Sequence, residues 1–118
     1  MSEQRIRREW RELRDQFDDD AVAMKESQQA LLWLSAAYRE LAAFEKTCVD
    51  DEIADWLLSD DPGLRFDAIA LVVEHRIISA LPTLLSLRGR LEAATDPGAP
   101  SERAKVERAI QQLADMLP

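Results

Sequence analysis

The sequence has few of the residues that make turns and cross-links. Among its 118 residues there are three glycines, five prolines, one cysteine and one histidine. So little glycine and proline leaves little room for a turn-rich β protein, and the abundant Ala, Leu, Glu, Arg and Gln favour helix instead. The single cysteine, Cys48, excludes an internal disulfide and fits a reducing compartment. We therefore expect an all-α protein of the cytoplasm.

Long apolar runs are also missing. The longest run, from Ala68 to Val73, is far shorter than the ~18–20 residues that a membrane-spanning helix needs. The N-terminus has no apolar stretch, and acids such as Glu9 and Glu12 interleave its arginines. We therefore expect neither a secretory signal nor a transit peptide.

Basic residues are outnumbered, with 15 Lys and Arg against 23 Asp and Glu and a net charge of −8. Repulsion between like charges disfavours nucleic acid and an anionic membrane surface as partners. A basic protein would instead be attracted and steered towards the chain. Keeping a protein in solution is a second reason for an acidic composition, so charge alone does not identify a partner.

Motifs that would indicate catalysis are absent from the sequence. It contains no P-loop, no Gly-x-Gly-x-x-Gly and no zinc-ligand spacing. The run Asp18–Asp20 lacks the alternating ligands and the glycine of a calcium loop. His75 has no evident nucleophile to activate, and nothing near Cys48 in the sequence indicates an activated thiolate. A two-carboxylate hydrolase remains an alternative, although no pair of acids stands out. We expect no enzyme, no metal site and no cofactor.

What the sequence does have is helical periodicity. Apolar residues recur at steps of three and four in six segments. The expected helices cover residues 3–17, 21–46, 52–59, 62–74, 79–94 and 101–116. The residues expected to cap helix N-termini are Ser2, Asp18–Asp20, Asp50–Asp51, Asp61, Ser79 and Ser101. Pro62 and Pro82 fit the first turns of their helices, where the missing N–H is tolerated.

Between Ile53 and Leu87 several features occur in a characteristic order. An Asp-Pro turn at Asp60–Gly63 precedes the apolar–Arg pair Leu64–Arg65, and a small residue follows at Ala68. After a further turn, Leu81–Pro82 begins the next helix. This order resembles a HEAT-like helical repeat of the short bacterial kind. Roughly a third of the chain carries the resemblance, and the remainder matches only as generic helix.

The resemblance implies a short α-solenoid, a right-handed stack of about six helices arranged in pairs that bury their apolar faces against one another. The whole chain, 1–118, would form one domain. Its expected parts are an N-terminal capping helix (1–20), a repeat core (21–95) and a C-terminal helix (96–118). The resemblance further implies a structural link between Arg65 and Asp60 or Asp61, and a partner-binding face lined by residues 51–59 and 79–94.

A second Asp-Pro-Gly turn, Asp96–Gly98, follows Asp61–Gly63 by 35 residues, a spacing in the range of helical repeats. The helix after it lacks the apolar–Arg pair in the usual place. We therefore interpret the last helix as a degenerate or terminal unit.

The stretch from Asp50 to Asp67 is the most biased in the chain, with seven acids and one base. Helix capping and solvation would explain most of these acids. The functional interpretation is an acidic docking surface with an aromatic anchor. Its partner-binding residues would be Asp51, Asp55, Trp56 and Asp60. Trp56 shares a helical stripe with Ile53 and Leu57, which favours inward packing of its side chain.

These observations favour a non-catalytic protein–protein interaction module. A small, acidic helical-repeat protein is similar to the inhibitor or immunity proteins that neutralise secreted bacterial toxins. The partner would then be a basic toxin or enzyme, and the mechanism would be occlusion of its active site. The alternative is an adaptor or assembly subunit that self-associates, for example as a homodimer, through the apolar faces of helices 21–46 or 101–116. A small-molecule pocket between helices has support only from the aromatic residues.

Overall fold

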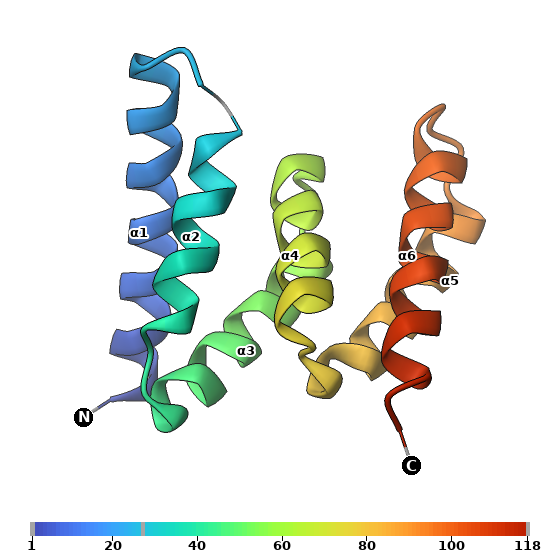
Figure 1. Ribbon diagram of the computed structural model, residues 1–118. Helices are drawn as coiled ribbons and strands as arrows, with labels where there is room; N and C mark the ends of the chain where they lie inside the picture. The colour runs from blue at the N-terminus through green and yellow to red at the C-terminus, as the bar shows by residue number, and fades with distance from the viewer. Residues whose placement is uncertain (1, 27, 118) are drawn as a thin grey trace. The chain divides into compact units, whose positions relative to one another are not determined.

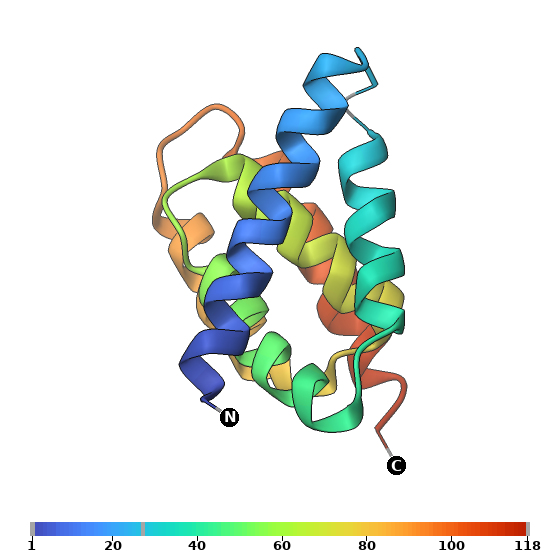
Figure 2. The same ribbon diagram turned by 90° about the vertical axis from the view of Figure 1, so that its left-hand side faces the viewer.

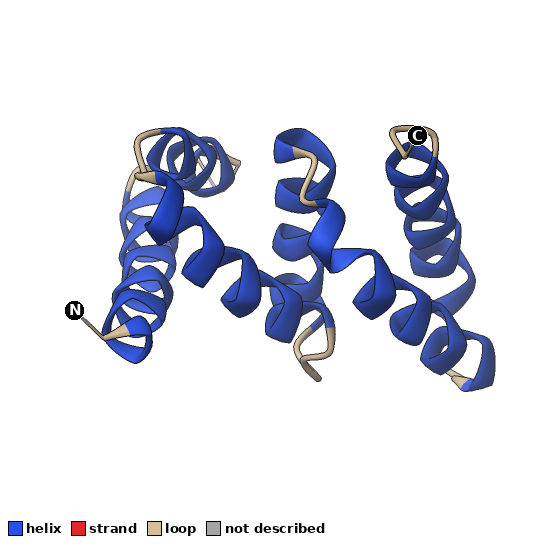
Figure 3. Cartoon of the chain, turned by 90° about the horizontal axis from the view of Figure 1, so that it is seen from below, coloured by secondary structure: helices blue, strands red, loops and turns tan. Residues whose placement is uncertain are grey.

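The computed structural model describes residues 2–26 and 28–117, and every regular element in that part of the chain is helical (Figures 1 and 3). The described elements are α1 (Glu3–Ala23), α2 (Gln29–Arg39), α3 (Ala43–Leu57), α4 (Pro62–His75), the 3-10 helix η1 (Ile78–Ala80), α5 (Leu81–Ala93) and α6 (Ala99–Ala114). For the described residues, the predicted all-α class and the count of six α-helices are confirmed. Several predicted helix boundaries are wrong.

Two compact units make up the chain, Met1–Glu52 and Ile53–Pro118. We call them the N-terminal unit and the C-terminal unit. The N-terminal unit holds α1, α2 and the larger part of α3. The C-terminal unit holds the end of α3 with α4, η1, α5 and α6. Each unit has its own set of buried apolar side chains.

In the N-terminal unit, α1 and α2 lie side by side and run in opposite directions (Figures 1 and 2). Trp10 of α1 and Tyr38 of α2 meet edge to face, with ring centroids 6.3 Å apart and planes at 70°. Leu34, four residues before Tyr38 on the same face of α2, is 1% exposed. Burial of such large apolar side chains is the main stabilising contribution in this pair of helices.

The predicted break at Asp18–Asp20 is wrong, because α1 continues through these residues to Ala23. Asp18 forms an ion pair with Arg14 one turn earlier, at 3.4 Å, the spacing at which helical side chains interact. Ala21 is 1% exposed, so it packs as an interior helical residue. The aspartates therefore belong to the helix interior rather than to a cap.

The predicted helix 21–46 is also wrong, since its residues lie in three elements. Lys25 takes a left-handed conformation (φ 58°) just after α1, and the amide of Glu26 donates to the Ala21 carbonyl at 2.9 Å. This is a common way to close a helix C-terminus. A second turn precedes α3, where a carboxylate oxygen of Glu45 accepts from the Ala42 amide at 2.9 Å, one half of a capping box.

The predicted short helix 52–59 is the second half of α3, which begins at Ala43 and ends at Leu57. Asp50 and Asp51 therefore lie in the helix interior, and their predicted capping role is wrong.

In the C-terminal unit, α4 begins as predicted. A carboxylate oxygen of Asp61 accepts from the Gly63 amide at 2.9 Å. Pro62 occupies the first position of the helix, where its missing N–H leaves no hydrogen bond unmade.

Two later N-termini differ from prediction. Residues Ile78–Ala80 form η1, so α5 begins at Leu81 and Ser79 is not its cap. Pro82 does lie in the first turn of α5, as predicted. The last helix begins at Ala99 with Pro100 in its first turn, so Ser101 is already helical and does not cap.

Arg65 of α4 makes its main polar contacts with residues other than the expected Asp60 or Asp61. Its guanidinium donates two hydrogen bonds to the Glu102 carboxylate of α6, at 2.6 and 2.9 Å, and a third to the Ser59 carbonyl at 2.9 Å. Hydrogen bonding to Glu102 is the largest cause of the raised pKa of Arg65, and burial opposes it. The charges of Glu102, Asp60 and Asp61 raise that pKa further, so the two aspartates act on Arg65 through their charge. The implied link is therefore corrected: Arg65 ties α4 to α6.

Candidate functional site

The acidic stretch from Asp50 to Asp67 is partly used inside the fold. Asp50 accepts a hydrogen bond from the hydroxyl of Tyr38 at 2.6 Å. Glu52 is 3% exposed, and one of its oxygens accepts from both Arg7 and Arg11 of α1 at 2.9 Å. Asp61 caps α4. Asp50, Glu52 and Asp61 therefore have structural roles within their own units.

Burial and the hydrogen bond between Tyr38 and Asp50 shift the pKa values of both side chains. Burial is the largest cause of the raised pKa of Tyr38, and the hydrogen bond to Asp50 and its charge raise it further. Burial likewise raises the pKa of Asp50, against the lowering effect of the Tyr38 hydroxyl. Both groups serve the packing of the N-terminal unit.

The four residues predicted to bind a partner have different environments. Asp51 is exposed in the N-terminal unit, and Asp55 and Asp60 are exposed in the C-terminal unit. Trp56 is only 3% exposed, so its indole packs inward and does not present an anchor on the surface. Asp60 lines a small polar hollow of about 180 Å³ together with Arg65 and Arg90.

A larger and more open hollow lies between α1 and α2. It is a groove of about 500 Å³ lined by Phe17, Asp20, Trp33, Ala36, Ala37 and Glu40. We call it the aromatic–acid groove. The Phe17 and Trp33 rings form its aromatic side, with centroids 5.7 Å apart and planes at 59°. Because Ala36 and Ala37 are small, they leave room beside the rings.

Helix geometry positions each of these side chains. Trp33, Ala37 and Glu40 are four and three residues apart, so they share one face of α2 and its C-terminal end. Phe17 and Asp20 are three residues apart on α1. The uninterrupted course of α1 through Asp18–Asp20 is what brings Asp20 to the groove.

The charge of the groove is negative. Asp20 and Glu40 are both exposed, and none of its six described lining residues is basic. Aromatic faces attract a guanidinium or ammonium group, and nearby carboxylates form charge-assisted hydrogen bonds with it. The groove is therefore suited to an arginine or lysine side chain presented by another molecule.

Sequence reasoning missed this groove. The helix expected over residues 3–17 ends at Phe17, and Asp20 is expected to cap the next helix, so the sequence prediction places neither of them beside the residues of α2. The spacing of Trp33 and Glu40 along one helix, together with that of Phe17 and Asp20 along another, was the available signal. It becomes visible only when α1 is extended past Asp18.

Cys48 and His75, the two residues considered for nucleophilic chemistry, lie in different units. Cys48 is 2% exposed in the N-terminal unit, and burial raises the pKa of its thiol, with further raising by the charges of Glu3 and Asp51. His75 lies in the last turn of α4, in the C-terminal unit. Among residues 2–26 and 28–117, no group of three or more His, Cys, Asp or Glu side chains is arranged to hold a metal ion.

Comparisons with protein-family models, with curated proteins and with solved structures gave no match to this chain. Within the described residues, no helix combines the length and the apolar character needed to cross a membrane.

Proposed function

We propose that this chain is a non-catalytic protein-binding module and that its aromatic–acid groove receives a basic segment of the partner. The observation that carries the proposal is the placement of Asp20 and Glu40 beside the Phe17–Trp33 ring pair, without a basic residue in the lining. Two carboxylates alone would be an ordinary solvated surface. The aromatic rings and the hollow beside them add a place for a side chain to enter.

Binding would proceed by attraction followed by insertion. The net charge of −8 draws a basic partner and raises the rate of association. An arginine or lysine side chain then stacks on Trp33 and reaches the carboxylates. The exposed Asp51, Asp55 and Asp60 contribute to the attracting field, and Trp56 is left out of the contact set because it is buried.

An inhibitor of the immunity type is the specific form of this proposal. Occupying a basic surface on a toxin or other enzyme would block access to its active site, and no catalytic group is needed on the inhibitor. We place this encounter in the cytoplasm, where the lone thiol of Cys48 stays reduced.

We also propose that the helices pair as in a HEAT-like repeat. The support is local: Asp61 caps α4 after the Asp-Pro turn, Arg65 is tied into its unit by hydrogen bonds, and Pro82 lies in the first turn of α5. Within the C-terminal unit, α6 packs on both α4 and α5. A right-handed stack forming a single solenoid domain from 1 to 118 is the arrangement that we propose.

A self-associating adaptor or assembly subunit is the second candidate function. Large apolar side chains are exposed on and near the helices of the N-terminal unit, among them Val22 at 71%, Leu32 at 60% and Phe44 at 53%. Exposed apolar residues of this size mark contact surfaces when they form a continuous patch. A homodimer that persists at high salt would favour this candidate.

The experiment begins with the purified chain as bait in its native lysate, eluted with a salt gradient. Each recovered protein is then purified, and its affinity is measured by isothermal titration calorimetry against the wild type and two charge variants. Asp20→Lys with Glu40→Lys should weaken binding of a basic partner at least about tenfold. The control, Glu12→Lys with Asp15→Lys, makes the same charge change at exposed positions of α1 outside the groove.

A second pair of variants separates stacking from charge. Trp33→Ala should weaken the same complex, whereas Leu32→Ala, at an exposed neighbouring position, should leave it nearly unchanged. Equal losses of affinity in both charge variants would show that only net charge matters. That result would contradict the aromatic–acid groove as the binding site. If the bait recovers only other copies of this chain, and the dimer persists at all salt concentrations, the result would favour the assembly-subunit candidate.

A further inference from the structure

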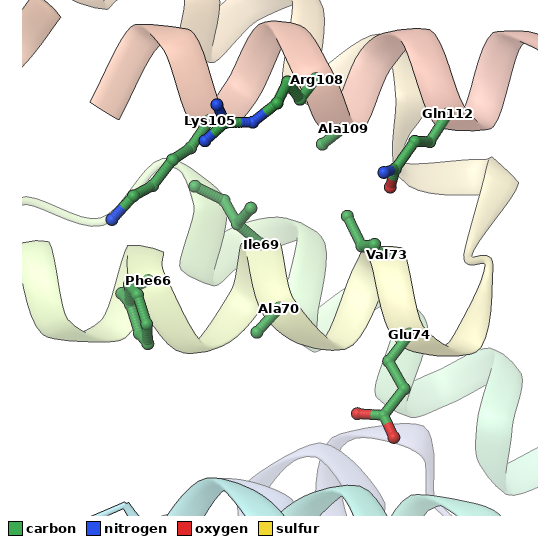
Figure 4. Close-up of a pocket in the computed structure, with 9 residues that line it drawn as sticks. All are labelled: Phe66, Ile69, Ala70, Val73, Glu74, Lys105, Arg108, Ala109 and Gln112. Carbon is green, nitrogen blue, oxygen red and sulfur yellow. The ribbon is translucent and has the colours of Figure 1, made fainter. Parts of the chain in front are cut away.

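The C-terminal unit contains a groove of a different character between α4 and α6 (Figure 4). Its volume is about 320 Å³. From this geometry we propose that the groove binds an acidic amphipathic helix of a partner protein. We call it the α4–α6 groove. It lies in the other unit from the aromatic–acid groove, and the inference does not depend on the function proposed above.

The lining residues have the spacing of helix surfaces that receive another helix. On α4, the apolar lining consists of Phe66, Ile69, Ala70 and Val73, which are three, one and three residues apart. On α6, the lining residues Lys105, Arg108, Ala109 and Gln112 repeat the same spacing. Both walls therefore follow a helical stripe for about two turns, or roughly 10 Å.

An occupant that touches both stripes along that length has to be elongated and to place apolar groups at the same period. An amphipathic helix meets both conditions, because its own apolar side chains recur every three or four residues. Phe66 is 52% exposed and would gain the most burial, while the small Ala70 and Ala109 leave space for the partner's side chains.

The charge of the occupant follows from Lys105 and Arg108. Ion pairs or hydrogen bonds occupy three of the five other arginines of this unit: Arg65 with Glu102, Arg90 with the Leu58 carbonyl, and Arg103 with Glu107. Lys105 instead lies 5.1 Å from the centre of the Phe66 ring. Within the described part of the chain, neither Lys105 nor Arg108 has a carboxylate within ion-pair distance.

Lys105 and Arg108 place two cations along one edge of the groove, in a unit that has seven Lys and Arg against ten Asp and Glu and a net charge of −3. Glu74 also lines the groove, but Figure 4 shows its carboxylate directed away from α6. The α6 edge is therefore basic. Carboxylates on the flank of a bound helix would reach Lys105 and Arg108 and form charge-assisted hydrogen bonds with them.

A partner protein is favoured over an anionic membrane because the net negative charge of the unit opposes approach to such a surface. The concave, striped groove is also shaped for a helix rather than for a flat bilayer. A second copy of the chain and a membrane are therefore outcomes that the test has to exclude.

The test uses the full chain as target for a displayed library of 18-residue helices in which apolar, acidic and basic positions are all randomised. We expect enrichment of helices with apolar residues at i, i+3, i+4 and i+7 and with Asp or Glu beside them. The most enriched helix is then synthesised with a fluorophore, and its affinity is measured by anisotropy.

Affinity of that peptide should fall at least about tenfold for Lys105→Glu with Arg108→Glu, and also for Phe66→Ala. The matched control, Arg76→Glu with Arg103→Glu, reverses two charges of the same unit outside the groove and should bind normally. Asp20→Lys with Glu40→Lys should also bind normally, which separates this surface from the aromatic–acid groove. Circular dichroism confirms that each variant is folded.

Three results would overturn the proposal. Enrichment of basic helices, or of none, would exclude an acidic helical ligand. A dimer in sedimentation equilibrium that Phe66→Ala dissociates would assign the groove to a second copy of the chain. Flotation with phosphatidylglycerol vesicles that Lys105→Glu abolishes would assign the basic edge to a membrane.

Discussion

Arg65 and Glu102 form a two-pronged ion pair that joins the first turns of α4 and α6. Nε and Nη2 of the guanidinium lie 2.6 and 2.9 Å from the two carboxylate oxygens. The side chains are only 15% and 20% exposed. Bidentate geometry and partial burial make this contact stronger than a typical surface pair. Arg65 directly precedes the groove residue Phe66, and Glu102 lies three residues before the groove residue Lys105.

Glu102→Ala should lower the free energy of unfolding by about 2 kcal/mol, because it leaves Arg65 half-buried without its carboxylate. Urea denaturation followed by circular dichroism measures the change. Glu107→Ala is the control on the same helix, since Glu107 faces Arg103 at 3.9 Å with both side chains well exposed. Its loss should be about 0.5 kcal/mol or less. Equal effects of the two substitutions would contradict a structural role for the Arg65 pair.

Glu52→Ala should destabilise the N-terminal unit by about 3 kcal/mol. The Glu52 side chain is 4% exposed and accepts from both Arg7 and Arg11, so its removal leaves two cations without their shared acceptor. Glu9→Ala removes an exposed carboxylate that pairs with Arg5 at 3.1 Å on the same helix and should change stability little. Thermal and urea unfolding measure the stability of both variants. Equal losses of stability for Glu52→Ala and Glu9→Ala would contradict the structural role of Glu52.

Features set by neighbouring residues could be predicted from the sequence, and features set by distant contacts could not. The cap at Asp61 and the first-turn position of Pro62 follow from local chemistry, and the structure has both. Asp18 is ambiguous because an aspartate can begin a helix or pair with an arginine one turn back. In the structure, Asp18 pairs with Arg14 and lies inside the helix.

The same distinction explains the sites. Glu102 lies 37 residues from Arg65, so no local rule could choose it over Asp60 or Asp61. The aromatic–acid groove likewise needs the packing of α1 on α2 to bring Phe17 to Trp33. The inward packing of Trp56, by contrast, follows from the stripe that it shares with Ile53 and Leu57, and its 3% exposure agrees.

Tyr38 should titrate at an unusually high pH in the folded protein. It is the single tyrosine of the chain, so the ultraviolet absorbance of phenolate reports on it alone. Its pKa is raised from 10.0 by burial, the hydrogen bond to Asp50 and the charge of Asp50. Because the folded-state pKa is the higher one, this stabilisation is complete below pH 10 and is lost as the pH rises further.

Asp50→Asn should lower the pKa of Tyr38, because it removes the charge that opposes phenolate formation. An unchanged titration of the variant would show that Asp50 does not act on the hydroxyl. Burial remains in the variant, so the pKa should stay above that of an exposed tyrosine.

Asp50 itself should make the protein less stable as the pH rises above 3.8. Burial raises its pKa from that ordinary value, so the folded state holds the proton more tightly than the unfolded state. The stabilisation is present at lower pH and is lost as the carboxyl ionises in the folded protein. Urea unfolding from pH 4 to 7 should therefore show the wild type losing stability relative to Asp50→Asn. A constant difference between the two proteins would contradict the raised pKa.

Replacing Lys25 or Arg76 with glycine should increase the stability of the folded protein. Both have positive φ, 58° and 55° respectively, while none of the described glycines does. A left-handed conformation costs a residue with a Cβ roughly 1–2 kcal/mol, of which glycine's extra unfolded-state freedom cancels part. We expect a net gain of about 0.5–1 kcal/mol for Lys25→Gly and for Arg76→Gly in urea unfolding.

The matched substitutions Lys25→Val and Arg76→Val should lower stability at the same positions, because a β-branched side chain tolerates positive φ least. The two sites lie just after α1 and α4, in different units, so each pair of variants tests its own helix end. The charge lost is the same in the glycine and valine variants. A gain with glycine and a loss with valine would therefore isolate the backbone conformation, and losses of equal size in both would assign the effect to the removed cation.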